Sequence, residues 1–504
     1  MSRQPRTDLW SWFWLALGAA LMLFANGADT IALAAWLAPV FLLRFVRRQR
    51  ALVGLPIAFV VLAAVFAFQF RGMVPIPGIF YCLFLILVGI LGVMPYLLDR
   101  LLAPRLSGLA STLVFPTTWV AVEYLFSRGP YGSWGSIAYS QYGNLALLQL
   151  LSVTGLWGIT FLIGWFAAVS NRAWEEGFAS MRIRADALLC AGVIAMVFLL
   201  GGARLAFAPP SAPTVRVATL AKMEVTPIPS DAMFYRMLRN ESTSTDRAAI
   251  LRWTTATNNN LLSRAAREMK AGAKIVFWGE TNALVLQRNE AAFIARGSAL
   301  ATKYHAYLGM ALGVLDIGKK PPYENKFVLI EPNGQVAWTY DKVHPVPGPN
   351  TTLQVRGNGK LRESDTPYGR LSAIICFDGD FPQLLAQAGT LGADIVLDPS
   401  NDWRAIDPWH TRMASFRGIE QGFNLVRATS GGLSAAFDYQ GRRLAAVDYY
   451  RTTDPTMISA VPTKGVRTIY SRLGNWFAWL SIAALLALIA KSLGVLPNRK
   501  SQTN

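Results

Sequence analysis

The sequence predicts a polytopic helical membrane protein with a mixed-sheet α/β domain inserted before its last membrane helix. Hydrophobic residues make up 53% of the 504 residues, and the mean hydropathy is positive, as in membrane proteins. Apolar stretches of spanning length fill the first two hundred residues and recur once near the end. Between residues 212 and 470, short apolar strands alternate with helices and hairpins, which is typical of α/β domains.

Eight apolar stretches are long enough to cross a bilayer, which predicts about eight spans. The first is not expected to be a cleaved signal peptide, because it lacks a small-residue cleavage site and further spans follow it. The expected spans are residues 9–27, 29–46, 51–70, 78–98, 108–127, 145–169, 186–207 and 476–496.

Basic residues set the expected orientation of these spans. They follow the second, fourth and sixth stretches and flank both ends of the chain, so these segments are expected in the cytoplasm. The chain then divides into a transmembrane region (1–208), an extracytoplasmic domain (212–470), a membrane helix (474–496) and a cytoplasmic tail (497–504). The basic residues used are Arg3, Arg6, Arg44, Arg47, Arg48, Arg50, Arg100, Arg105, Arg172, Arg182, Arg184, Arg499 and Lys500.

The net charge of +18 would suggest a nucleic-acid partner in a soluble protein. Here lysine and arginine flanking membrane helices, and contact with anionic lipid, explain it. The sequence contains no Walker loop, zinc-type Cys/His spacing or RNA-binding motif. We therefore expect a bilayer environment, with no nucleic acid, metal or cofactor.

One acidic residue lies inside an expected span. Glu123 falls within residues 108–127, and a charge in the membrane indicates a functional site. It lies near the outer end of the span, so snorkelling to the interface is an equal alternative. The following loop, 129–144, is rich in Gly, Tyr, Trp and Ser, which suits the membrane interface and an entry for lipid.

An apolar strand that ends on a thiol organises the α/β domain. Residues 371–375 are apolar, and Cys376 follows at the carboxyl end, where open α/β sheets place their chemistry. The other cysteines, Cys82 and Cys190, lie in apolar membrane stretches, so Cys376 has no evident disulfide partner. Free cysteine often serves only as a packing residue, but a lone thiol outside the membrane is also a candidate nucleophile.

Two charged residues occupy corresponding places beyond other strands. Glu280 closes the strand that contains residues 275–278, and Lys342 follows the strand that ends at Tyr340. A carboxylate can take the proton of a thiol, and an ammonium can stabilise the oxyanion formed when a thiolate adds to a carbonyl. Strand-end charges are more often simply solvated. A Cys/His pair with His344 or His410 is an open alternative, whereas His305 is expected to be structural.

These motifs resemble those of the carbon–nitrogen hydrolase (nitrilase) superfamily, whose catalytic residues are Glu, Lys and Cys in that order. Within it, the chain resembles the membrane branch, the apolipoprotein N-acyltransferase family. The similar segments are residues 35–39, 135–141, 149–158, 278–280, 340–344, 375–378, 400–403, 417–420, 427–429 and 468–470.

The resemblance implies an αββα nitrilase-like sandwich and a ping-pong acyl transfer. Cys376 would take an acyl chain from a phospholipid as a thioester, with Glu280 as general base and then general acid. Lys342 and the backbone N–H of Phe377 would form the oxyanion hole. The acceptor would be the α-amine of the diacylglyceryl-cysteine of an apolipoprotein. The resemblance also implies a monomer in a bacterial inner membrane with its catalytic domain in the periplasm.

The resemblance assigns further site residues and shows departures. Asp378 would orient the lysine, and Trp278, Asn401 and Trp403 would bind substrate. Asn350 stands where the family usually has a second glutamate, and asparagine cannot supply that charge. Phe377 and Asp378 stand where the family often has Tyr-Glu, residues 403–410 depart from its Trp-Phe-Gly run, and Ser430 stands where asparagine is common. These departures surround the expected substrate cleft and leave the identities of the acyl donor and the acceptor open.

Two other functions remain open from the sequence. A membrane-anchored amidase would form the same thioester and release a free acid to water. A non-catalytic lipid-binding relative would not need Cys376. The loops 345–359 and 404–409 are the candidates for a lid over the cleft.

Overall fold

The computed structural model describes residues 9–177, 180–348 and 351–495, and the chain forms two compact units. One unit is Met1–Ala208 together with Leu473–Asn504, and the other is Pro209–Arg472. The first is helical and the second contains both sheets.

The helical unit is built around α5, which packs against α4, α8 and α16. The apolar stretch of α5 is 56% buried, against 17% or less for α3, α4 and α9, so those three helices present most of their apolar surface outward. The helices are α1 (Leu9–Leu23), α2 (Ala32–Arg48), α3 (Ala51–Gln69), α4 (Gly78–Leu102), α5 (Leu109–Ser127), α6 (Leu145–Leu148), α7 (Leu151–Thr154), α8 (Leu156–Glu176), α9 (Met181–Phe207) and α16 (Trp476–Ser492), with 3₁₀ turns η1 (Ala103–Arg105) and η2 (Ile137–Gln141).

Four of the described helices (α3, α4, α5 and α9) are long and apolar enough to cross a bilayer, or five if α6 to α8 form one broken span. Helices α1, α2 and α16 have 15 to 17 residues. At 1.5 Å per residue these are about 22–26 Å long, shorter than the hydrocarbon core of about 30 Å. The helical unit therefore supports an integral membrane protein. Four or five of its described helices have spanning length, whereas the sequence predicted about eight spans.

The expected span over 145–169 is not one straight helix. The chain bends by 116° between Leu145–Thr154 and Leu156–Glu176. Gly155 at the bend has φ +65°, in the left-handed region that glycine adopts without a Cβ clash. Upstream, the side chain of Asn144 accepts a hydrogen bond from Leu147 N–H and caps α6. An apolar stretch of spanning length thus becomes a short helical hook followed by one straight helix.

The α/β unit contains two sheets. The first has the order β13-β1-β2-β4-β5-β6, with β3 beside β4, and the second has the order β12-β11-β10-β9-β8-β7. The strands are β1 (Thr214–Leu220), β2 (Ile275–Trp278), β3 (Ala283–Leu286), β4 (Tyr307–Leu315), β5 (Tyr323–Ile330), β6 (Val336–Asp341), β7 (Glu363–Thr366), β8 (Gly369–Ala373), β9 (Ile395–Asn401), β10 (Asn424–Ser430), β11 (Leu433–Phe437), β12 (Arg443–Asp448) and β13 (Thr456–Pro462).

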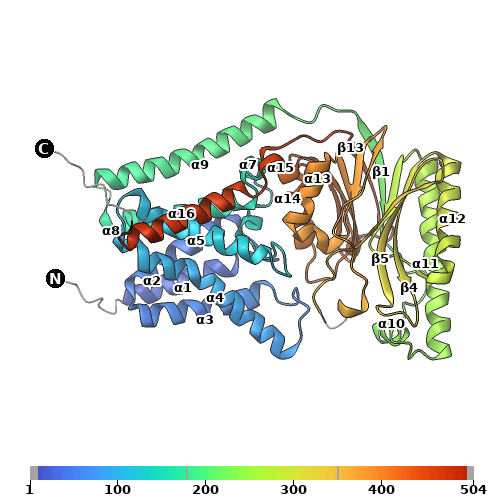
Figure 1. Ribbon diagram of the computed structural model, residues 1–504, viewed down its shortest axis with the longest axis horizontal. Coiled ribbons are helices and arrows are strands. Elements are labelled where there is room, and N and C mark those ends of the chain that lie inside the picture. Colours follow the sequence, from blue (N-terminus) through green and yellow to red (C-terminus); the bar gives the residue numbers. More distant parts are fainter. Residues whose placement is uncertain (1–8, 178–179, 349–350, 496–504) are drawn as a thin grey trace. The chain divides into compact units, whose positions relative to one another are not determined.

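The two sheets lie face to face between two helical layers, in the order helix, sheet, sheet, helix (Figure 1). Helices α11 and α12 cover the first sheet, and α13 and α14 lie on the outer side of the second. The helices are α10 (Asp231–Leu238), α11 (Ser244–Lys270), α12 (Gln287–Tyr304), α13 (Pro382–Leu391), α14 (Trp409–Gln421) and α15 (Ile469–Leu473), with 3₁₀ turns η3 (Thr351–Leu353), η4 (Cys376–Asp380) and η5 (Tyr449–Arg451).

Strand direction brings several strand ends together. In the first sheet β1, β2 and β4 are parallel, and β6 runs the same way because β5 is antiparallel to both of its neighbours. In the second sheet β8, β9 and β10 are parallel. The carboxyl ends of β2 and β6 therefore share one edge, and those of β8 and β9 share an edge of the facing sheet.

Candidate active site

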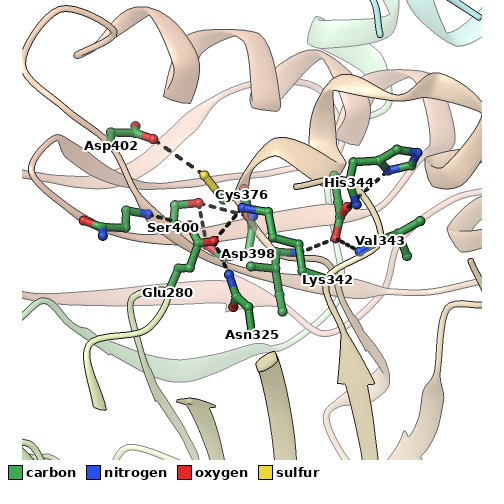
Figure 2. Close-up of polar contacts among 12 residues, drawn as sticks. Glu280, Asn325, Lys342, Val343, His344, Cys376, Asp398, Ser400 and Asp402 are labelled. Carbon is green, nitrogen blue, oxygen red and sulfur yellow. Dashed lines mark hydrogen bonds and ion pairs between the residues drawn. The ribbon is translucent and has the colours of Figure 1, made fainter. Parts of the chain in front are cut away.

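Three side chains from these strand ends converge between the sheets (Figure 2). Glu280 lies two residues beyond β2, Lys342 follows β6 directly, and Cys376 begins η4 three residues beyond the end of β8. All three are buried, with 5%, 3% and 3% of their surface exposed. Lys342 Nζ donates a hydrogen bond to Glu280 Oε1 at 2.5 Å. The structure thus brings together the three residues predicted to be catalytic.

The carboxylate of Glu280 is held by three donors. Its Oε1 accepts from Lys342 Nζ and from Asn325 Nδ2 at 2.6 Å, and its Oε2 accepts from the backbone N–H of Asn401 at 3.2 Å. Both lone pairs of Oε1 are therefore used, whereas Oε2 retains one. That remaining position is where Glu280 can take a proton.

Cys376 has a strained backbone. Its φ is +54°, which a residue with a Cβ rarely adopts. Its N–H donates to Asp398 Oδ1 at 2.9 Å, and its thiol donates to Asp402 Oδ1 at 3.9 Å. Backbone strain of this kind persists only where surrounding contacts hold it, as at functional sites.

Charge and burial act in opposite directions on the thiol. Burial and the Glu280 carboxylate raise the pKa of the Cys376 thiol, whereas Lys342 and His410 oppose the rise. Burial by itself would lower the pKa of Lys342, but the negative groups around it, Glu280 foremost, raise it. Lys342 therefore remains an ammonium, and the Cys376 thiol needs a base before it can attack.

Asp378 holds the chain segment after Lys342 rather than the lysine side chain. Its Oδ2 accepts from Tyr340 Oη at 2.8 Å, and its Oδ1 accepts from the backbone N–H of His344 at 2.8 Å. It also accepts from Ile375 N–H at 3.3 Å, just before the cysteine. Its contacts thus bracket both Lys342 and Cys376, so it positions them through the backbone.

The predicted substrate contacts divide into two groups. Trp278 is a core residue: it is fully buried, and its indole N–H donates to the carbonyl of Ala311 at 3.0 Å. Its ring packs against Phe293 of α12, and its expected contact with substrate stays a prediction. Asn401 is the last residue of β9 and Trp403 lies two residues beyond it; both are partly buried, and the backbone N–H of Asn401 donates to Glu280. Asn350 lies outside the described residues.

A buried charge network behind Cys376 was missed by sequence reasoning. Arg427 Nη1 bonds Asp398 Oδ2 at 2.5 Å, and its Nη2 bonds Asp402 Oδ1 at 3.1 Å. His410 Nδ1 lies 2.9 Å from the same Asp402 oxygen. A charged residue within an apolar strand, such as Asp398 in β9 or Arg427 in β10, is the signal that could have revealed it, because buried charges are paired.

The two histidines of the open alternative differ in position. His410 lies beside Cys376, since one ring nitrogen, the sulfur and an oxygen of Asp402 fall within 4.8 Å of one another. His344 stacks on Phe381 at 3.5 Å between ring centroids. Its Nδ1 lies 3.2 Å from Asp378 Oδ1. Only His410 is placed to act on the sulfur.

Glu123 lies in the helical unit on the wall of a mainly apolar cavity of about 150 Å³, which Trp119, Trp134 and Trp157 also line. Its Oε2 accepts from Ser136 Oγ and Thr160 Oγ1, each at 2.7 Å, and its Oε1 accepts from Ile137 N–H at 3.0 Å. The carboxylate thereby ties α5 to the following loop and to α8. It does not reach outward as snorkelling requires.

Two family models match the chain. The apolipoprotein N-acyltransferase N-terminal domain matches residues 4–169, and the carbon-nitrogen hydrolase model matches residues 242–470. Together they cover most of both units.

Curated relatives extend across both matched regions. An apolipoprotein N-acyltransferase of Geobacter metallireducens is 28% identical over 420 residues, which is 76% of this chain and 74% of that protein. Apolipoprotein N-acyltransferase 2 of Treponema pallidum is 26% identical over 444 residues, 77% of this chain and 76% of that protein. Among solved structures, an amidase from Nesterenkonia sp. is 17% identical, covers 50% of this chain and 92% of its own, and gives a TM-score of 0.39.

Proposed function

Because the chain belongs to the apolipoprotein N-acyltransferase family, we propose that it moves a fatty acyl chain from a phospholipid to the α-amine of a diacylglyceryl-cysteine. The acyl chain passes through a thioester on Cys376. The observation that carries this proposal is the buried contact between Glu280 and Lys342 beside that thiol. All three groups come from one chain, so a monomer suffices.

In the first half-reaction Glu280 Oε2 takes the thiol proton of Cys376. The thiolate attacks the ester carbonyl of the phospholipid, so a C–S bond forms and the bond to the glycerol oxygen breaks. Glu280 returns the proton to that oxygen, and a lysophospholipid leaves. The oxyanion receives hydrogen bonds from Lys342 Nζ and Phe377 N–H. Phe377 is the second residue of η4, where a backbone N–H lacks a partner within the turn.

In the second half-reaction the neutral α-amine of the acceptor attacks the thioester carbonyl. The C–N bond forms, the C–S bond breaks, and the sulfur of Cys376 leaves. Glu280 takes the proton from the attacking nitrogen and returns it to the sulfur. Asn401 at the end of β9 and Trp403 just beyond it are proposed to contact the substrate.

We propose a bacterial inner membrane topology of eight spans with the α/β unit in the periplasm. One observation within the helical unit supports the sidedness: the carboxyl-terminal ends of α2, α4 and α8 meet. Arg47 pairs with Asp99 at 2.8 Å and with Glu175 at 3.2 Å. Arg100 donates to the carbonyl of Val46 at 2.7 Å. A shared basic end fits the cytoplasmic side.

The test is acyl transfer with purified protein in vesicles. The vesicles contain phospholipid with an isotopically labelled acyl chain, and the acceptor is a synthetic diacylglyceryl-cysteine peptide with a free α-amine. The matched control peptide has its α-amine acetylated. We expect labelled N-acylated product with the free amine, none with the acetylated peptide, and none with the Cys376→Ala variant.

Other outcomes would select the other functions. Labelled free fatty acid that forms equally with either peptide would replace the transferase by a hydrolase with water as acceptor. Unchanged activity in Cys376→Ala would remove the thioester from the mechanism. Retained phospholipid with no labelled product of any kind would favour a lipid-binding protein.

A further inference from the structure

The proposed mechanism uses none of the groups in the charge network behind Cys376, and one of them, His410, lies beside the sulfur. His410 lies on α14, and the residue is 2% exposed. Its Nδ1 lies 2.9 Å from Asp402 Oδ1, and its Nε2 lies 3.3 Å from Asp380 Oδ1. A carboxylate thus faces each ring nitrogen. Ionised carboxylates only accept hydrogen bonds, so the two aspartates favour an imidazolium, which donates from both nitrogens, whereas the Arg427 guanidinium 2.8 Å from Nδ1 opposes it.

The charge balance of the cluster also favours a protonated ring. Asp380, Asp398 and Asp402 are three buried carboxylates, and Arg427 is the guanidinium among them. With a neutral His410 ring these four groups carry a net charge of −2, and with an imidazolium the cluster carries −1. Uncompensated buried charge is costly, so the second cation stabilises the cluster.

The same residues satisfy the distance requirement for a metal site. One ligand atom each from Cys376, Asp402 and His410 lies within 4.8 Å of the other two, and these ligand types suit a soft divalent cation. However, Arg427 Nη2 lies 2.8 Å from His410 Nδ1 and 3.1 Å from Asp402 Oδ1. A metal ion bound by these two atoms would have to displace a buried, doubly paired guanidinium. The cluster is better suited to a proton than to a metal.

We propose that His410 is a fourth catalytic residue, whose imidazolium stabilises the thiolate of Cys376 in addition to Lys342. This inference rests on the proposed thioester function, since both half-reactions pass through the thiolate. The thiolate is the nucleophile when the acyl ester is attacked, and it is the leaving group when the amine attacks the thioester. Glu280 still carries the proton in both steps, and His410 keeps its own.

Two further observations agree with this role. Burial and Arg427 lower the pKa of His410, but Asp380 and Asp402 outweigh them, so the pKa lies well above its ordinary value. The ring therefore stays charged through neutral pH. Figure 2 shows Asp402, which holds the ring, on a different side of the sulfur from Glu280 and Lys342.

The test is the pH dependence of alkylation of Cys376 by iodoacetamide, followed by mass spectrometry of the cysteine peptide. Because only the thiolate reacts, the midpoint reports its stability. We expect His410→Asn to move the midpoint upward by about one pH unit or more, which is about a tenfold slower reaction at pH 7.

The matched control is His305→Asn. His305 follows α12 and precedes β4, so it lies at the amino edge of the first sheet, away from Glu280. Its φ is +51°, which asparagine tolerates. We expect an unchanged midpoint. An unchanged midpoint in a folded His410→Asn variant as well would overturn the proposal.

A variant that fails to fold does not end the test. The chain has three histidines, so ¹⁵N-histidine labelling of the wild-type protein resolves each ring, with assignment by His305→Asn and His344→Asn. We expect the His410 ring to be doubly protonated at pH 7, and a neutral ring overturns the inference. Failure of acyl transfer is a separate result, because neither readout requires a substrate.

Discussion

Two glutamates, one in each unit, have hydrogen-bonded carboxylates but different partners. Glu123 in the helical unit accepts from two hydroxyls and one backbone N–H. Glu280 in the α/β unit accepts from an ammonium, an amide and a backbone N–H, and it lies beside a thiol. Residue type and hydrogen bonding alone therefore do not distinguish Glu123 from Glu280, the proposed general base. What distinguishes Glu280 is its cationic partner, Lys342, and a nearby nucleophile, Cys376.

The largest expected difference is between Glu280→Gln and Glu123→Gln. Around Glu280 the Lys342 ammonium and the Asn401 backbone N–H cannot act as acceptors, and Lys342 loses its counter-charge when the carboxylate becomes an amide. Around Glu123 the hydroxyls of Ser136 and Thr160 can turn and accept. We expect acyl-thioester formation to fall about 10²–10⁴-fold in Glu280→Gln, as for loss of a general base. Glu123→Gln should stay within a fewfold of wild type.

Single-turnover rates of thioester formation measure this pair under the same conditions. If Glu123→Gln lost as much activity as Glu280→Gln while retaining its melting temperature, Glu123 would have a role in the reaction. The two glutamates would then not differ in function as the account requires.

A smaller difference is expected when one donor is removed from each carboxylate. Asn325→Ala removes a donor to Glu280 Oε1 at 2.6 Å, and Ser136→Ala removes a donor to Glu123 Oε2 at 2.7 Å. A hydrogen bond to a charged group contributes about 1.5–3 kcal/mol. We expect Asn325→Ala to slow acyl transfer about tenfold. Ser136→Ala should lower unfolding stability, with little effect on the rate of transfer in the folded protein.

Transfer rates at saturating lipid, together with melting temperatures, separate these effects. A loss of stability without slower transfer in Asn325→Ala would mean that Asn325 only supports the fold. Equal slowing in both variants would contradict the assignment of different roles to the two carboxylates.

The smallest effect concerns a carboxylate that has a cationic partner but no nucleophile. The Arg236 guanidinium and the Thr243 backbone N–H lower the pKa of Asp246 to about 2. A folded-state pKa below the unfolded value contributes stability above about pH 4, and this stability is lost as the pH falls toward 2. We expect Asp246→Asn to lower the melting temperature at pH 6 and to differ less from wild type near pH 2.5.

Acyl transfer at neutral pH is the control for this variant, and we expect it to be unchanged. If the difference in melting temperature were as large at pH 2.5 as at pH 6, the effect would come from packing rather than from the charge. Asp246 would then not be an example of a carboxylate that stabilises the fold through its charge.

The convergence of Glu280, Lys342 and Cys376 could be predicted because each follows a strand, and strands that run the same way end at one edge. The direction of a side chain at a strand end is harder to predict. Trp278, two residues before Glu280, faces the core. Which face a strand buries depends on the facing sheet, which the local sequence does not contain.

The position of His410, a residue on a helix, was equally hard to predict from the local sequence. It lies 34 positions after Cys376 in the chain, and only the packing of α14 brings it to the sulfur. In the helical unit, apolar length predicted spans but not their direction. The break at Gly155 depends on a positive φ and a cap at Asn144 that an apolar stretch conceals.

The most direct test of the central claim is the intact mass of the protein purified from native membranes. We predict an added fatty acyl mass that hydroxylamine removes, that maps to Cys376, and that is absent from Cys376→Ser. In Glu280→Gln the same mass should appear far more slowly when phospholipid is supplied. No adduct on the wild-type protein, even after incubation with phospholipid vesicles, would contradict the account, because the proposed transfer cannot proceed without the thioester.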